Sequence, residues 1–134
     1  MKSVSLSEGT NRSRVHLMTR PVGNDLVVFI TNEQAHVGAV AVAEYSAGEN
    51  RASTSVITRL GHKDDLIAYM AAHVLCRRLK KPVCAIAGIH LDDITVEEID
   101  QVTRNCGTLV DRLGEILGEQ SPDSAKAPAG QPKL

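Results

Sequence analysis

Three short segments hold the histidines, glycines and charged residues whose types and spacing could do chemistry. They are QAHVG at 34–38, GHKDD at 61–65 and AGIHLDD at 87–93. Imidazole, ammonium and carboxylate groups can bind anions or metals or transfer protons, and glycine lets a ligand approach the backbone closely. The function of the chain therefore depends on whether these segments meet in the fold.

The second segment directly precedes a predicted helix. A helix start presents unpaired N–H groups and the positive end of the helix dipole, so it can hold a phosphate. Gly61 allows close approach, and His62 and Lys63 add cationic donors. In the alternative interpretation, Asp64 or Asp65 caps the helix and Lys63 is solvated. The G-x-x-x-x-G-K-[ST] pattern of a P-loop is absent.

The third segment surrounds the end of a predicted strand. Gly88 lies within the strand pattern, where glycine often marks a bulge or a place where a ligand meets the backbone. His90 follows just past the strand end, either as a ligand contact or as a hydrogen-bonded turn residue. Asp92 and Asp93 precede a helix and are typical of first-turn partners of its dipole.

The histidines of the three segments suggest one further hypothesis, a metal-dependent enzyme. His36, His62 and His90 could ligate a transition metal together, but their wide separations match no local metal motif. No nucleophile elbow is present, and no cysteine lies near a base in the sequence. We therefore predict no metal ligands and no catalytic residues.

Composition excludes several classes of function. Lys and Arg number 15 against 16 Asp and Glu, so the formal net charge of -1 gives no electrostatic footprint for nucleic acid. With 2% aromatic residues, few rings are available to stack on a planar ligand. The apolar runs are too short to cross a bilayer, and no secretory signal precedes them. Three widely spaced cysteines among apolar residues indicate reduced thiols in a cytoplasmic protein.

The elements that must position the three segments are strands first and helices second. Strands are predicted at 15–20, 25–31, 36–45, 53–58 and 83–89. The first two are joined by a tight turn, and 83–89 follows a helix. The order of elements is therefore β-β-β-β-α-β-α. We expect an α+β fold with one mixed, mostly antiparallel sheet covered on one face by two helices. Its uncovered face would need a partner, so we expect a homodimer.

Both helices show apolar residues at helical spacing. The first begins at Asp64 and ends before Pro82, which cannot continue a helix. Its stripe comprises Leu66, Ile67, Met70, Ala71, Val74, Leu75 and Leu79. The second begins at the capping box of Thr95 and Glu98. Its stripe comprises Ile99, Val102, Cys106, Leu109, Val110, Leu113 and Leu117, with Gly107 at a predicted bend or close contact and Gly118 at its end.

The two ends of the chain are poor in large apolar residues. Residues 1–13 are polar and rich in serine, and residues 119–134 combine Pro, Ala, Gly and Lys. Such segments bury too little surface to offset their ordering entropy, so we predict both to be disordered. The folded domain is then expected to comprise residues 14–118.

The three segments carry a family resemblance. HVG at 36–38, HKD at 62–64 before a helix, and AGIH at 87–90 before an acidic turn and a second helix recur in this order. Together they resemble the small D subunit, or prenylated-flavin chaperone, of UbiD-type hydroxyarene carboxylate decarboxylases such as gallate and protocatechuate decarboxylases. The chain departs from that pattern at Ala35, where some relatives have proline, and at Asp65, which adds a negative charge.

This resemblance implies a fold like that of proteasome-assembly chaperones and a non-catalytic role. The implied ligand is prenylated flavin mononucleotide, or flavin mononucleotide itself, received from a flavin prenyltransferase and delivered to the large decarboxylase subunit. The matching positions would contact this cofactor: His36, Gly38, Gly61, His62, Lys63, Asp64, Gly88 and His90. The alternative that remains open is an assembly or structural subunit without its own ligand.

Overall fold

The computed structural model describes residues 1–59 and 64–120 of the 134-residue chain. In these residues the strands are β1 (Ser5–Glu8), β2 (Val15–Val22), β3 (Asp25–Thr31), β4 (Ala39–Ser46), β5 (Arg51–Thr58) and β6 (Val83–Gly88). The helices are α1 (Asp65–Leu79) and α2 (Val96–Gln120), with a short 3-10 helix, η1 (Asn11–Ser13), between β1 and β2.

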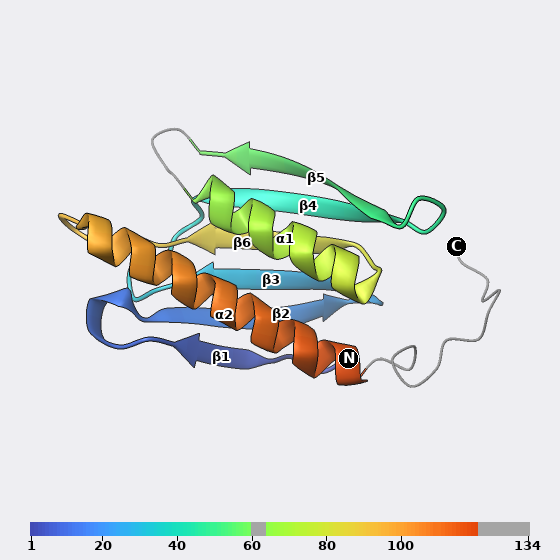
Figure 1. Cartoon of the computed structure of the whole chain (residues 1–134), viewed down its shortest axis with the longest axis horizontal. Helices are drawn as coiled ribbons and strands as arrows, with labels where there is room; N and C mark the ends of the chain where they lie inside the picture. Colours follow the sequence, from blue (N-terminus) through green and yellow to red (C-terminus); the bar gives the residue numbers. More distant parts are fainter. Residues whose placement is uncertain (60–63, 121–134) are drawn as a thin grey trace.

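The strands form one mixed sheet in the order β1-β2-β3-β6-β4-β5. Only the β3–β6 pair among the described strands is parallel, because α1 carries the chain back across the sheet before β6 enters between β3 and β4. Both α1 and α2 lie on the same face of the sheet (Figure 1). The predicted architecture, a mostly antiparallel sheet covered by two helices, is confirmed.

The core lies between the sheet and the two helices. Under α1, the strands β4 and β6 present mainly small buried residues: Ala39, Ala41, Ala43, Ala85 and Ala87, with Val83 at the start of β6. The facing side of α1 contains buried Ala68, Ala71 and Ala72, followed by Leu75 and Cys76. Alanine on both sides lets helix and sheet approach closely, and larger residues such as Leu17, Ile30, Leu109 and Leu113 fill the remaining core.

The end of α1 and the start of α2 are each defined by local hydrogen bonds. Lys80 adopts a left-handed conformation (φ 58°, ψ 46°) after α1, and its N–H donates to the Cys76 carbonyl. At the start of α2, the Glu98 N–H donates to Thr95 Oγ1 at 3.1 Å and the Thr95 N–H donates to Glu98 Oε1 at 3.0 Å. This reciprocal pair confirms the capping box. Neither helix in the described part of the chain has the length and apolar composition needed to cross a membrane.

The N-terminal segment contradicts its prediction. Residues 1–13 are part of the fold, because β1 pairs with β2 at the edge of the sheet and η1 packs beside α2. The strand was missed because Ser5–Glu8 contains one large apolar residue, Leu6, and an edge strand needs few of them. Helix α2 continues past Gly118 to Gln120. From residue 121 onward, the C-terminal segment that we predict to be disordered lies outside the described residues.

Apolar periodicity also predicted more buried helix residues than the structure shows. Leu66 is 77% exposed, Val74 is 38% exposed and Ile99 is 49% exposed, although all three belong to the predicted stripes. Ile94 and Ile99 occupy the two positions of a hydrophobic staple around the Thr95 cap, which explains apolar residues there without a core. An added Cβ at Gly107 would meet no atom within 4 Å, so the predicted close contact there is wrong.

Candidate functional site

Three described loops meet at one edge of the sheet, which we call the loop edge. It contains the β1–β2, β3–β4 and β6–α2 connections, the end of β5 and the start of α1, because β1, β3, β5 and β6 all run toward this edge (Figure 1). In open α/β sheets, ligands typically bind at the carboxyl ends of the parallel strands. The first and third chemistry-bearing segments fall in two of these loops, and Asp64 and Asp65 of the second lie at the start of α1.

Asp64 is the most buried charged residue at the loop edge, with a side chain 8% exposed. It immediately precedes α1, yet its side chain makes no cap hydrogen bond to that helix. Its Oδ1 instead accepts the Ile89 N–H at 3.1 Å, and its Oδ2 lies 3.3 Å from His36 Nε2. Asp64 therefore joins the β3–β4 loop to the start of the β6–α2 loop, and the interpretation that it caps α1 is wrong.

The charge of Asp64 also affects a cysteine in the core. Burial, and secondly the nearby Asp64 carboxylate, raise the pKa of the Cys106 thiol on α2 to about 12. Cys106 therefore stays protonated and unreactive at neutral pH, as expected for a buried thiol.

His36 is held between two oxygen acceptors. Its Nδ1 lies 3.1 Å from the Gln34 carbonyl oxygen, and its Nε2 faces the Asp64 carboxylate. These two contacts fix the orientation of the ring, and the side chain is 22% exposed.

At Gly38 and Gly88, other atoms of the chain occupy the space that a side chain would need. A Cβ on Gly88 would lie 1.6 Å from the His36 carbonyl oxygen, and one on Gly38 would lie 1.9 Å from Asp64 Oδ2. The Gly38 N–H also donates to the Ala87 carbonyl at 2.9 Å. The space that a Cβ would need at these two glycines is thus filled by the chain itself.

His90 is fixed through its backbone and carries an open side chain. The buried Asn32 clamps that backbone: its Nδ2 donates to the His90 carbonyl at 2.9 Å, and its Oδ1 accepts the His90 N–H at 3.3 Å. The imidazole is 55% exposed and lies 2.9 Å from Asp92 Oδ1. Asn32 was not identified from the sequence, where it reads as an ordinary turn residue.

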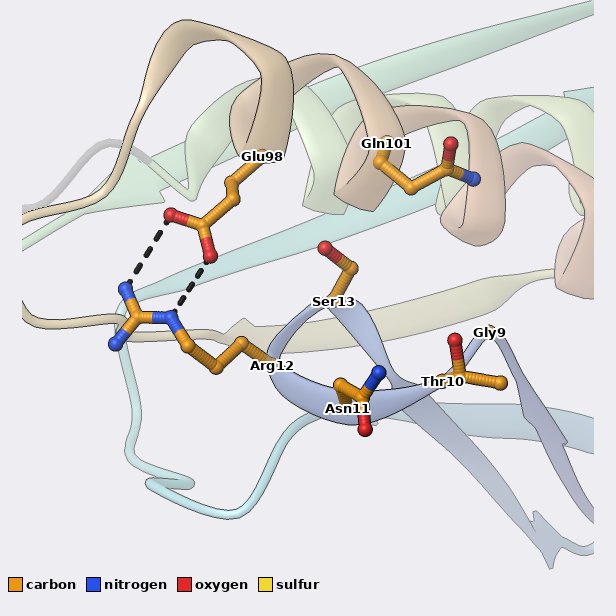
Figure 2. Close-up of a pocket in the computed structure, with 7 residues that line it drawn as sticks. All are labelled: Gly9, Thr10, Asn11, Arg12, Ser13, Glu98 and Gln101. Atoms are coloured by element: carbon orange, nitrogen blue, oxygen red, sulfur yellow. Dashed lines mark hydrogen bonds and ion pairs between the residues drawn. The ribbon is translucent and has the colours of Figure 1, made fainter.

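A cavity of about 550 Å³ lies between residues 9–13 of the β1–β2 loop and Glu98 and Gln101 of α2 (Figure 2). Arg12 connects the cavity to the β6–α2 loop. Its Nη2 donates to the Asp92 carbonyl at 2.6 Å, and its Nε donates to Glu98 Oε2 at 2.7 Å. This cavity was not predicted, because residues 1–13 were expected to be disordered.

The structure thus brings together His36, Gly38, Asp64, Gly88 and His90 of the predicted site residues. Gly61, His62 and Lys63 lie outside the described residues, as does the predicted phosphate position that depends on them. Among residues 1–59 and 64–120, no three His, Cys, Asp or Glu side chains are close enough to share a metal ion. The three-histidine hypothesis also needs His62, which is not described.

The Arg12–Glu98 pair predicts a pH-dependent contribution to stability. The hydrogen bond from Arg12, and secondly the Thr95 N–H, lower the pKa of Glu98 from 4.5 to about 2. Because this pKa is lower in the folded protein, the contact stabilises the fold above about pH 4.5 and is lost as pH falls toward 2. Arg12→Met should therefore lower the urea midpoint at neutral pH, with a deficit that shrinks near pH 2.

The matched control is Arg20→Met, an exposed arginine on β2 with no ion pair in the described part of the chain. It should leave the urea midpoint nearly unchanged at both pH values. A deficit of Arg12→Met that is equally large at neutral pH and near pH 2 would contradict the ion-pair explanation.

The fold and the loop edge define a small α/β protein whose polar groups gather in the loops at one end of a single sheet. The chain belongs to the family of the prenylated flavin chaperone LpdD-like domain, whose family model matches residues 9–118. This match includes β2 to β6, both helices and the η1 turn.

Solved structures give the same fold. The chain is similar to a chain in the crystal structure of a novel chaperone complex for yeast 20S proteasome assembly, with a TM-score of 0.56 and 13% sequence identity. The similarity covers 90% of this chain and 98% of that chain. At this identity it shows the fold alone, and it confirms the predicted proteasome-assembly-chaperone-like architecture. No curated protein sequence matches the chain.

Proposed function

We propose that this protein is a non-catalytic carrier of prenylated flavin mononucleotide, which it binds at the loop edge and helps deliver to the large subunit of a UbiD-type aromatic acid decarboxylase. A flavin prenyltransferase would supply the cofactor. The observation that carries the proposal is the family match over residues 9–118, since it spans the whole loop edge. The convergence of His36, Asp64 and His90 at that edge supports it.

The cofactor phosphate is proposed to bind at Gly61–Asp64, where His62 and Lys63 precede α1. The buried Asp64 carboxylate bears on this proposal, because it lies at the same helix start and its charge opposes a second anion. The imidazole Nε2 of His36 lies 3.3 Å from this carboxylate. A phosphate would therefore depend on the cation of Lys63, which makes this lysine the sharpest position to test.

Lys63→Ala should weaken binding of prenylated flavin mononucleotide about tenfold, the order expected for one hydrogen bond to a charged group. The measurement is a spectroscopic titration of the purified protein with the cofactor. Lys81→Ala serves as the matched control, because Lys81 lies between α1 and β6, at the opposite edge of the sheet. Equal affinity in both variants would refute the role of Lys63.

The same titration decides between the carrier and the alternative, an assembly subunit without its own ligand. If the wild-type protein neither changes the absorbance of the prenylated cofactor nor co-elutes with it, the carrier proposal fails. The decarboxylase subunit is then tested alone, by co-elution of the two proteins without cofactor.

We also propose that the protein is a homodimer formed through the open face of the sheet. On this face Met18 is 52% exposed, Val42 is 48% exposed and Ile57 is 75% exposed. The strand register places Cys84 beside Val42, near the centre of the face. An apolar surface spread over several strands of a sheet is typical of an interface.

Thiol labelling tests this dimer, because Cys84 is the half-buried cysteine while Cys76 and Cys106 are fully buried. Maleimide should label wild-type Cys84 slowly at high protein concentration and faster on dilution. Val42→Lys should give a monomer by light scattering with fast labelling at every concentration. Val96→Lys, at a 75% exposed position on α2, should leave both readouts unchanged. A wild-type monomer with concentration-independent labelling would exclude the dimer.

A further inference from the structure

A histidine on the open face of the sheet contacts a hydroxyl and a carboxylate at once. The Nδ1 of His16, on β2, lies 2.8 Å from Ser7 Oγ on β1, and its Nε2 lies 2.7 Å from Glu33 Oε1 in the β3–β4 loop. These contacts span 9 and 17 positions of the sequence. No local motif joins residues at such separations, so the sequence alone did not indicate this cluster.

The pairing of β1 with β2 holds the hydroxyl beside the imidazole. Ser7 and His16 are directly opposite each other in the strand register, so their side chains leave the sheet on the same face. His16 alternates with the buried residues Val15 and Leu17, which places it on the open face together with Met18. The imidazole is 31% exposed, so a small molecule can reach the cluster from solvent.

The carboxylate of Glu33 determines which ring nitrogen of His16 carries the proton. An ionised carboxylate only accepts hydrogen bonds, so a neutral His16 ring carries its proton on Nε2, toward Glu33. The Nδ1 atom then has a free lone pair and accepts the hydroxyl proton of Ser7. The hydrogen bond from His16 lowers the pKa of Glu33, so this carboxylate stays ionised at neutral pH.

This arrangement can activate the Ser7 hydroxyl. A serine bonded to an imidazole that a carboxylate orients is the group that activates serine nucleophiles on several unrelated folds. In this chain Nδ1 faces the hydroxyl and Nε2 faces the carboxylate, and either ring nitrogen can serve as the base once the other is protonated. The geometry therefore provides a nucleophile, a general base and a group that orients the base.

Ser5 provides an internal comparison for the reactivity of Ser7. It lies on the same strand and the same face, two residues earlier, and it is the more exposed of the two serines. Its cross-strand neighbour is Met18 instead of a histidine. If solvent access alone decided the reactivity, Ser5 would react first. If His16 decides it, Ser7 reacts first.

We propose that Ser7 is a nucleophilic serine that takes the acyl group of an aryl ester, with His16 as its general base. In this step Ser7 Oγ forms a bond to the acyl carbon, and the bond from that carbon to the aryl oxygen breaks. The hydroxyl proton passes to His16 Nδ1 and then to the departing phenolate, so the products are an acyl-serine and a phenol. Glu33 is a positioning residue, because it acts through the ring of His16. This reactivity is independent of the proposed carrier function.

The first experiment adds p-nitrophenyl acetate to the whole chain at mildly alkaline pH. Wild-type protein should release a burst of about one p-nitrophenolate per chain, the kinetic sign of an acyl-enzyme. Mass spectrometry of the peptides should place the acetyl group on Ser7 and leave Ser5 unmodified. Ser7→Ala should abolish the burst, and Ser5→Ala should retain it. Acetylation of Ser5 as fast as that of Ser7 would overturn the proposal.

The same measurement is made on Val42→Lys, because the proposed dimer uses the open face of the sheet. Val42 is on β4, and Ser7 and His16 are on β1 and β2 at the other margin of this face. The substitution should therefore leave the cluster intact while it exposes the face. If Ser7 is acetylated in neither wild-type protein nor Val42→Lys, the proposal fails whether or not a dimer forms.

The second experiment tests the base and the residue that orients it. His16→Ala should slow acetylation of Ser7 at least about a hundredfold, the lower end of the usual effect of a general base. Glu33→Gln should slow it about tenfold, and nitrogen NMR shifts of the His16 ring should show that Nε2 no longer carries the proton alone. Glu97→Gln, at an exposed position on α2, is the matched control and should change neither readout. An unchanged rate of Ser7 acetylation in His16→Ala would overturn the proposal, and an unchanged rate in Glu33→Gln would overturn the role of Glu33.

Discussion

Gly88→Ala should unfold or strongly destabilise the protein, with a loss of about 3 kcal/mol or more in the free energy of unfolding. The new Cβ would lie 1.6 Å from the His36 carbonyl oxygen and 2.5 Å from its carbonyl carbon. Both are backbone atoms, so no side-chain rotation relieves the clash, and the β3–β4 loop has to move away from β6. Urea denaturation followed by circular dichroism measures the loss.

Gly107→Ala is the control for this prediction. Gly107 lies inside α2, and an added Cβ would meet no atom within 4 Å. Alanine is preferred over glycine in a helix interior, so this variant should be more stable by roughly 0.5–1 kcal/mol. The two substitutions add the same methyl group with opposite expected signs. A Gly88→Ala protein as stable as wild type would show that the β3–β4 loop does not pack against β6 in solution.

The elements of the fold with strong local signals were predicted well from the sequence. Pro82, the Thr95 capping box and the β-branched run at 25–31 each specify a helix end, a helix start or a buried strand through local chemistry alone. The β1 strand has no such signal, because its pairing with β2 depends on backbone hydrogen bonds that any sequence can make. Leu66 shows the opposite failure, since periodicity identifies an apolar face and not what covers it.

The candidate site was predicted only in part, because local patterns identify residues and not their tertiary contacts. Histidines and glycines in three segments indicated the loop edge, and the structure places His36, Asp64 and His90 there. Whether a glycine makes room for a ligand or for the chain itself depends on tertiary packing, so the tight contact of Gly88 with His36 could not be foreseen. The bonds of Asn32 and Arg12 span 58 and 80 residues, and no local pattern carries them.

Asp64→Ala should remove about 3 kcal/mol of stability and weaken binding of the prenylated cofactor more than tenfold. The substitution removes the acceptor of the Ile89 N–H and the carboxylate beside His36 in a buried position. An unsatisfied buried donor costs about 1–3 kcal/mol, and the Ile89 N–H would be left in that state. Because Ile89 and His90 are adjacent, loss of the Asp64 bond also releases the backbone that carries the His90 side chain.

Two companion variants separate the bond from the charge. In Asp64→Asn the amide oxygen can still accept the Ile89 N–H, so this variant should keep much of the stability that Asp64→Ala loses. Asp65→Ala removes the neighbouring carboxylate in the first turn of α1, whose contribution through the helix dipole is about 0.3–1 kcal/mol. Urea denaturation and cofactor titration of the three variants rank their losses of stability and of cofactor affinity. Equal losses in Asp64→Ala and Asp65→Ala would mean that Asp64 acts only as a helix-end charge, and that another group holds the β3–β4 and β6–α2 loops together.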